Sequence, residues 1–345
     1  MKTIKIFIIF FGLTVSIFAQ NTDEQLLRAA FIGDIKAVKY ALNNGANIEA
    51  TNHRGWTALI RAANQGYTNI VRLLLDNGAN IEAVCGEGTA LVHASWHGHT
   101  KTVKLLLEHN AKVFTCVMLP TIIFAANNGH KEIVKLFLDA GVYVNIKDEI
   151  GGYGGPGLEE QNTEDTELKL TDKEILSLKS TPKTTNTDTT PKIESDKTMH
   201  LLPELSYFPT IGLPNHLGGA TIIIWASQNG HTDIVHLLLD RGADVNAMGM
   251  YGNYALYVAT KGNYIDTIRL LVDRGADINQ KGTWATTTAL ICAVKNGSID
   301  IVRLLLERGA DVNIKDYDGN TALSIAKKNK NTEIIQILEN AGAKK

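Results

Sequence analysis

The sequence predicts an all-α repeat solenoid, in which helix–turn–helix units stack with extended turns between them and one largely disordered insert interrupts the stack. Three observations support this fold class. Two short phrases recur along the chain, and most copies follow one another at 31 to 34 residues. Both phrases carry apolar residues at helical spacing. One interval measures 101 residues instead, and its extra residues are rich in proline and threonine.

The first nineteen residues have the layout of a secretory signal peptide. Two lysines precede the apolar run 6–18, and Ala19 follows it. The run is shorter than the ~20 residues needed to span a bilayer, so we expect residues 1–19 to be removed on export. The mature chain is then predicted to have no membrane span and to reach the periplasm, the cell envelope or the secreted space.

The first phrase is a short helix that begins at a threonine and ends before a glycine. Threonine is a good helix N-cap, and glycine suits the left-handed conformation that ends a helix. Four copies are clear and three are weaker: TALIRAANQG (57–66), TALVHASWHG (89–98), TIIIWASQNG (221–230) and TALICAVKNG (288–297), then 120–129, 254–263 and 321–330.

The second phrase follows about a dozen residues later and predicts another helix that ends in glycine. Its copies include IVRLLLDNGANIEA (70–83), IVHLLLDRGADVNA (234–247) and IVRLLLERGADVNI (301–314). Asn110 and Asn263 stand where glycine is missing, and asparagine is the next best left-handed residue. A further copy at 37–50 belongs to an eighth unit that starts near Thr22.

These intervals divide the chain into four parts. Residues 1–19 are the signal peptide, 20–151 hold repeats one to four, 152–217 form the insert and 218–345 hold repeats five to eight. The insert contains six of the seven prolines, with 11 acidic and 6 basic residues, a composition typical of disorder.

The two phrases together resemble the ankyrin repeat family. The resemblance covers residues 22–150 and 218–345, although the family's Thr-Pro-Leu-His becomes Thr-Ala-Leu followed by another residue. It implies a solenoid that binds another protein through a concave face, formed by the turn tips and the exposed ends of the first helices. The insert would leave from a turn that borders this groove.

Carrying those surface positions onto this sequence gives the candidate partner-binding residues. Three of the four tryptophans are among them, and Trp and Tyr are favoured interface anchors. The full set is His53, Arg54, Trp56, Asn64, Gln65, Trp96, His97, Asn127, Asn128, Gln228, Asn229, Met250, Tyr251, Asn253, Lys261, Trp284, Lys295, Asn296, Tyr317, Asp318 and Asn320.

The sequence offers few signs of a catalytic, phosphate-binding or metal-binding site. It has no Gly-x-Ser-x-Gly, and GGYGGPG (151–157) lacks the lysine of a phosphate loop. His93 and His97 are four residues apart and could share a helix face, but no further ligand has a suitable spacing. The three cysteines fit no metal site, and whether Cys85 and Cys116 pair is left open. We therefore predict no catalytic residues, no cofactor and no metal.

The resemblance implies an interaction protein, and we predict a monomer that binds another protein. The net charge of −2 lacks the basic footprint of a nucleic-acid binder, so we predict no nucleic-acid partner. Two alternatives stay open. The chain could be an auto-regulated scaffold whose insert, 152–217, occupies the groove. It could also be an enzyme or ligand binder whose site the insert completes.

Overall fold

The computed structural model describes residues 22–113, 121–147, 219–249, 252–282 and 287–344. The described residues of both halves fall in one compact unit. They form helices joined by turns and contain isolated β-bridges but no strands. The predicted signal peptide (1–19) and insert (152–217) lie outside the described residues, as do Cys116, Met250, Tyr251 and Trp284.

The helices alternate between two kinds, as the two phrases predict. The first helices are residues 22–32, α3 (Ala58–Asn64), α5 (Ala90–Trp96), α7 (Thr121–Asn127), α10 (Ile222–Gln228), α12 (Ala255–Lys261), α14 (Ala289–Asn296) and α16 (Ala322–Lys328). The second helices are α2 (Ile35–Asn43), α4 (Thr68–Asp76), α6 (Thr100–Glu108), α8 (Lys131–Asp139), α11 (Thr232–Asp240), α13 (Ile265–Asp273), α15 (Ile299–Glu307) and α17 (Thr332–Asn340).

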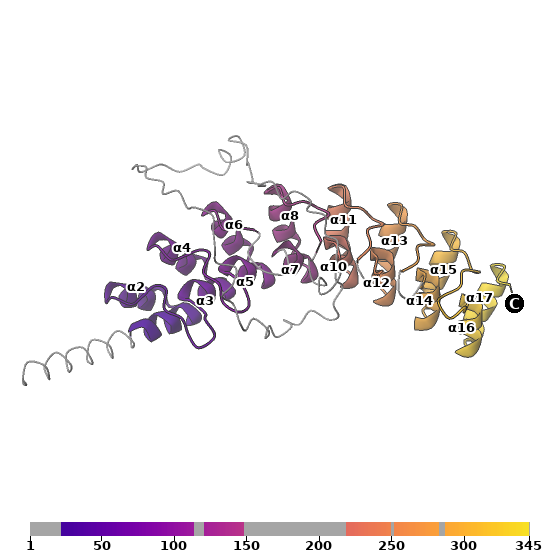
Figure 1. Cartoon of the computed structure of the whole chain (residues 1–345), viewed down its shortest axis with the longest axis horizontal. Coiled ribbons are helices and arrows are strands. Elements are labelled where there is room, and N and C mark those ends of the chain that lie inside the picture. Colours follow the sequence, from indigo (N-terminus) through magenta and orange to yellow (C-terminus); the bar gives the residue numbers. More distant parts are fainter. Residues whose placement is uncertain (1–21, 114–120, 148–218, 250–251, 283–286, 345) are drawn as a thin grey trace, which may run out of the picture. The chain divides into compact units, whose positions relative to one another are not determined.

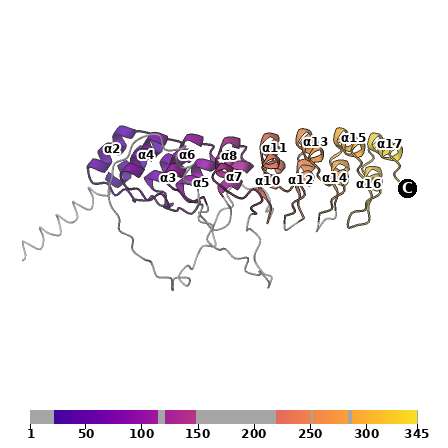
Figure 2. The same ribbon diagram turned by 90° about the horizontal axis from the view of Figure 1, so that it is seen from above.

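Each pair of helices is one repeat, and neighbouring repeats stack through like helices. From α3 to α16, each first helix packs on the next first helix along the chain, and the second helices follow the same order (Figures 1 and 2). Small side chains permit this close stacking, since Ala62 and Ala63 of α3 are fully buried, as are Ala94 and Ala125 at equivalent positions. The core is therefore continuous from repeat to repeat.

The predicted threonine caps are present on four first helices. The side-chain oxygen of Thr288 accepts a hydrogen bond from the backbone N–H of Ile291 at 3.3 Å, and Thr57, Thr89 and Thr321 do the same in their own helices. Such a cap satisfies a backbone donor that the first turn of a helix leaves free. The predicted left-handed residues are confirmed as well, with φ of 61° at Asn110 and 60° at Asn263.

A histidine joins each of three successive repeats to the repeat before it. Nε2 of His130 donates to the backbone oxygen of Trp96 at 2.9 Å, and the equivalent His99 and His231 donate to the oxygens of Asn64 and Asn127 at 2.9 and 2.8 Å. These oxygens lie at the ends of first helices, where the helix itself supplies no donor.

The imidazole can reach that oxygen because a glycine ends the helix. At Gly98, φ is 76°, and an added Cβ would lie 2.6 Å from Cε1 of the His130 ring. The glycine thus has two roles, since it adopts a left-handed conformation and leaves room for the ring of the next repeat.

A second set of contacts joins the turns that follow the second helices. In these turns a carboxylate or amide oxygen accepts the backbone N–H of the equivalent turn one repeat later, from Glu49 to Asn80 at 2.7 Å and from Asn246 to Asp277 at 2.8 Å. The same contact recurs from Glu82, Asn145, Asn279 and Asn313. The sequence analysis missed this ladder, although Glu or Asn recurs at one place in six of the second phrases.

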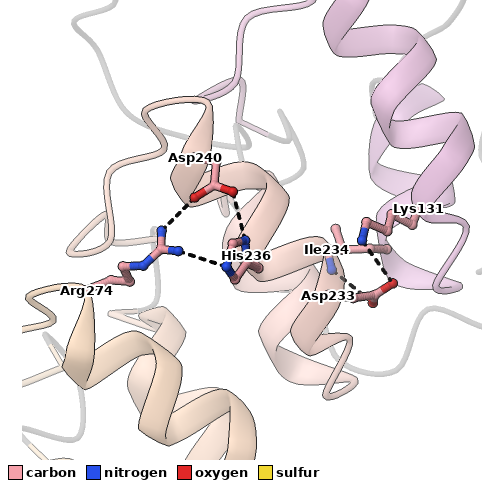
Figure 3. Close-up of polar contacts among 6 residues, drawn as sticks. All are labelled: Lys131, Asp233, Ile234, His236, Asp240 and Arg274. Atoms are coloured by element: carbon pink, nitrogen blue, oxygen red, sulfur yellow. Dashed lines mark hydrogen bonds and ion pairs between the residues drawn. The ribbon is translucent and has the colours of Figure 1, made fainter.

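Repeats four and five stack as consecutive repeats do, although the insert separates them in sequence. Helix α7 packs on α10 and α8 on α11. Lys147 forms an antiparallel bridge with Thr221, and Nζ of Lys131 lies 3.9 Å from the carboxylate of Asp233 (Figure 3). The phrase that stops at residue 147 therefore resumes at residue 221.

The bridges give the size of the insertion. Lys147 and Thr221 are 74 residues apart, whereas the equivalent partners Lys315 and Thr321 are six residues apart. The connection is thus 68 residues longer than an ordinary turn. Its two ends meet at one bridge, as the ends of an ordinary turn do.

We expect Gly98→Ala to destabilise the protein more than Gly78→Ala. Both glycines have positive φ, 76° and 85°, but nothing lies within 4 Å of a Cβ added at Gly78. Backbone strain alone should cost about 1 kcal/mol in Gly78→Ala, and displacement of the His130 ring should raise the cost to roughly 2–4 kcal/mol in Gly98→Ala. Urea unfolding measures both, and equal losses would contradict the role of the ring.

We also expect the stack to form without the long connection. In the test, residues 148–220 are replaced by the turn Asp-Tyr-Asp-Gly-Asn of residues 316–320. A shorter connection costs less entropy to close, so the variant should keep its far-UV helix signal and unfold at or above the midpoint temperature of the full chain. Loss of the helix signal would show that the stack needs residues 148–220.

Candidate interaction surface

The described candidate residues lie on two parts of the repeats, the tip of the turn that precedes a first helix and the last residues of that helix. We call these together the turn–helix surface. Repetition of one unit brings the same parts of successive repeats next to each other. The geometry shows which side chains are available there and which are used within the stack.

The turn tips are held rigidly while their side chains project into solvent. Oδ1 of Asn52 accepts the backbone N–H groups of Arg54 and Trp56 at 2.9 and 3.0 Å, and Thr51 bridges to Thr57. His53 and Arg54 at the tip are exposed. Side chains held on such a fixed backbone lose less entropy on binding a partner.

The turn in the last repeat has the same construction around a carboxylate. Oδ1 of Asp316 accepts the backbone N–H groups of Asp318 and Asn320 at 3.1 and 2.9 Å. Tyr317 is 82% exposed and Asp318 is exposed. The sequence analysis did not name Asn52 and Asp316, although an Asn or Asp that accepts from the N–H two residues later is a recognisable turn signal.

Asp316 also holds one of the candidate lysines. Its Oδ2 lies 3.3 Å from Nζ of Lys295. Burial by itself would raise the pKa of Asp316, but the backbone hydrogen bond from Asn320 and the interaction with Lys295 outweigh it, so the pKa is lower than its ordinary value. Asp316 is therefore ionised at neutral pH and can hold both the turn and the lysine.

The two described candidate tryptophans rest on the following repeat. The Trp56 ring lies 4.6 Å from the ring of His93 between centroids, and the Trp96 ring lies 5.2 Å from that of Phe124. Both tryptophans are half-buried. One face of each ring thus contributes to stacking, and part of each ring stays accessible. Trp225, which was not a candidate, is fully buried.

Several candidate amides are used for stacking. Nδ2 of Asn128 donates to the backbone oxygen of Trp96 at 2.9 Å, and Nδ2 of Asn296 donates to that of Thr260 at 3.1 Å. Asn127 is buried and its Oδ1 accepts from Nδ2 of Asn229 at 2.8 Å. These amides supply donors or acceptors at the ends of first helices, where backbone groups lack partners. Asn127 is buried and Asn128 and Asn229 are half-buried, whereas Asn296 stays exposed.

The remaining described candidates differ in exposure. His97 and Lys261 are exposed, whereas Gln65, Gln228, Asn253 and Asn320 are half-buried. The side chains that the stack leaves most available are therefore those of His53, Arg54, His97, Lys261, Tyr317 and Asp318.

His93 belongs to a buried polar chain, whereas His97 is exposed. Its Nδ1 lies 3.2 Å from Oδ1 of Asn64, and its Nε2 lies 3.4 Å from Sγ of Cys85. His97 is the C-cap of α5, and its backbone N–H donates to the backbone oxygen of His93 at 3.1 Å. Among the described residues, no group of three or more His, Cys, Asp or Glu side chains comes together as metal ligands would.

Burial shifts the pKa values of His93 and Cys85, two members of this polar chain. Desolvation, with a smaller contribution from His97, lowers the pKa of His93 to about 4. Desolvation also raises the pKa of the Cys85 thiol. Both groups are therefore neutral at pH 7, and the contact is a hydrogen bond between neutral partners.

We expect His93 to make stability depend on pH. Its pKa is about 4 when folded and about 6.5 when unfolded, so the unfolded chain binds more protons between these values. The contribution of His93 to the free energy of unfolding is complete above pH 6.5. It is lost as pH falls toward 4, on the order of 3 kcal/mol in total.

In His93→Phe, which copies Phe124 of the next repeat, the unfolding free energy should fall less steeply over this range. Urea unfolding at several pH values measures the slope. An unchanged slope in the variant would show that other groups carry the dependence.

Comparison with known proteins agrees with this geometry. The family model described as "Ankyrin repeats (3 copies)" matches residues 26–115, 197–282 and 283–345, and the one described as "Ankyrin repeat" matches residues 121–149. The second of these matches begins inside the predicted insert, at residue 197. No curated protein matches the chain. Across the described residues, no helix is both long enough and apolar enough to cross a membrane. Since the matched residues make up most of the sequence, the chain belongs to the ankyrin repeat family.

Proposed function

We propose that this protein is a non-enzymatic interaction protein that binds another protein through its turn–helix surface, the face that is concave in the family. Ankyrin repeats are general protein–protein interaction modules. A stack of repeats suits this role because it presents an extended surface, and binding on such a surface needs no catalytic groups. We further propose that the protein is exported, acts in the periplasm, cell envelope or secreted space, and is monomeric.

The observation that carries the proposal is the contrast between fixed turn backbones and free turn side chains. In the last turn, Asp316 holds the backbone through two hydrogen bonds, while Tyr317 next to it is 82% exposed. A tyrosine on a rigid turn offers a large contact area at a small entropic cost. Among the described residues, no hydrogen bond, ion pair or ring contact involves the side chain of Tyr317.

The buried thiols support a function without catalysis. Cys85 and Cys292 are both buried, and desolvation raises the pKa of each, to about 11 for Cys292. A catalytic cysteine needs a thiolate and access for its substrate. These two cysteines are better suited to packing.

The test is affinity capture with the chain lacking residues 1–19, followed by identification of the bound proteins. Tyr317→Ser should reduce recovery of the partner at least fivefold, because a tyrosine that anchors an interface contributes about 1 kcal/mol or more to binding. Tyr143→Ser is the matched control, since Tyr143 is 67% exposed but lies in the turn after a second helix. Both variants should unfold at the wild-type midpoint temperature.

Equal recovery by wild type and Tyr317→Ser would count against binding through this turn. Capture that requires deletion of residues 152–217 would instead favour the auto-regulated scaffold, in which the insert occupies the surface.

A further inference from the structure

The ends of the first helices change in chemical character along the chain. Counting the capping position as one, position eight holds Lys261 in α12, Lys295 in α14 and Lys328 in α16, and all three side chains are exposed. The same position in the earlier repeats, from α3 to α10, is uncharged and holds Asn64, Trp96, Asn127 and Gln228. We call Lys261, Lys295 and Lys328 the lysine row.

Two contacts place the first two lysines close together. Nδ2 of Asn296 donates to the backbone oxygens of Thr260 and Lys261 at 3.1 and 3.4 Å, so the ends of α12 and α14 lie side by side. The ammonium groups of Lys261 and Lys295 also both act on the pKa of Cys292, which they lower against the larger effect of burial. The repeat relationship places Lys328 one step further along.

Several charges of the second helices from α8 to α17 are arranged differently, because they are paired between repeats. Arg274 donates to Asp240 at 2.9 Å and to Nε2 of His236 at 3.0 Å, and all three side chains converge in Figure 3. Arg241 pairs with Asp139 in the same way, and so do Arg308 with Asp273 and Arg303 with Glu333. These pairs join opposite charges of successive repeats.

The lysine row has less of such compensation. Among the described residues, Lys261 and Lys328 have no carboxylate within ion-pair distance, and only Lys295 has one, Asp316. Like charges about 10 Å apart repel by roughly 0.4 kcal/mol in water. Lysine near a helix C-terminus also interacts favourably with the helix dipole, but α3, α5, α7 and α10 do without one at this position.

We propose that the lysine row binds an acidic, extended segment of the partner protein. This inference rests on the proposed function and specifies the chemistry of the partner. Packed helices lie about 8–10 Å apart, so the lysines recur at about that distance. An extended polyproline-type segment advances about 9 Å every three residues. Acidic side chains at every third residue would therefore meet one lysine each.

A protein segment fits this row better than a nucleic acid does. The chain has a net charge of −2, and the exposed carboxylates of Asp311 and Asp318 lie in the turn next to α16. A phosphate backbone carries charge at much closer spacing than one per repeat and would be repelled by these carboxylates. Isolated acidic side chains can avoid them.

The test uses a fluorescent synthetic peptide that repeats Glu-Ser-Ser, with binding followed by anisotropy at low salt. The triple variant Lys261→Glu/Lys295→Glu/Lys328→Glu should bind it at least tenfold more weakly than wild type. The matched control is Lys101→Glu/Lys104→Glu/Lys135→Glu, which makes the same charge change at exposed lysines of α6 and α8. Should the first variant unfold, the corresponding Lys→Gln triple variant replaces it, with an expected loss of at least threefold.

Equal binding by the lysine-row variant and its control would overturn the inference. Tighter binding of oligo-uridine than of the peptide would also overturn it, in favour of a nucleic-acid partner. Capture of the natural partner separates this inference from the proposed function. If capture depends on Tyr317 but survives reversal of the lysine row, only the inference fails. If capture depends on neither, the proposed function fails as well.

Discussion

The structure depends on the close approach of two neighbouring repeats at the end of the first helix. There a glycine with positive φ leaves space for a ring of the next repeat. Through this space Nε2 of His130 reaches the backbone oxygen of Trp96. The helix end, the left-handed residue and the contact between repeats are therefore one feature. The turns, the stacked alanines and the exposed side chains keep their places because this approach sets the distance between neighbouring repeats.

Stacking of this kind tolerates a long insertion because each repeat contacts only its neighbours. The bridge between Lys147 and Thr221 closes the connection at the place where Lys315 and Thr321 close an ordinary turn. The contacts between α7 and α10 are consequently of the same kind as those between repeats that are consecutive in sequence. An insertion inside a helix would have removed such contacts.

The fold could be predicted in detail because its signals are local. The threonine caps, the glycine ends and the left-handed Asn110 and Asn263 each follow from a residue's own conformational preference. The surface was harder to predict, since exposure depends on the next repeat. Asn128 donates to the backbone oxygen of Trp96, whereas His97 at the equivalent position is exposed. Only the packed arrangement distinguishes the two.

The histidine contact is not the same at every interface, and this gives the stack a direction. The position is His99, His130 and His231 in the middle repeats but Ser298 and Asn331 in the last two. Asn331 uses its side-chain oxygen to cap its own helix, at 3.1 Å from the backbone nitrogen of Ile334. Neither residue places a ring against the preceding glycine. Amide hydrogens should therefore exchange fastest in the final repeats, and a pulling force should peel the protein from its C-terminal end.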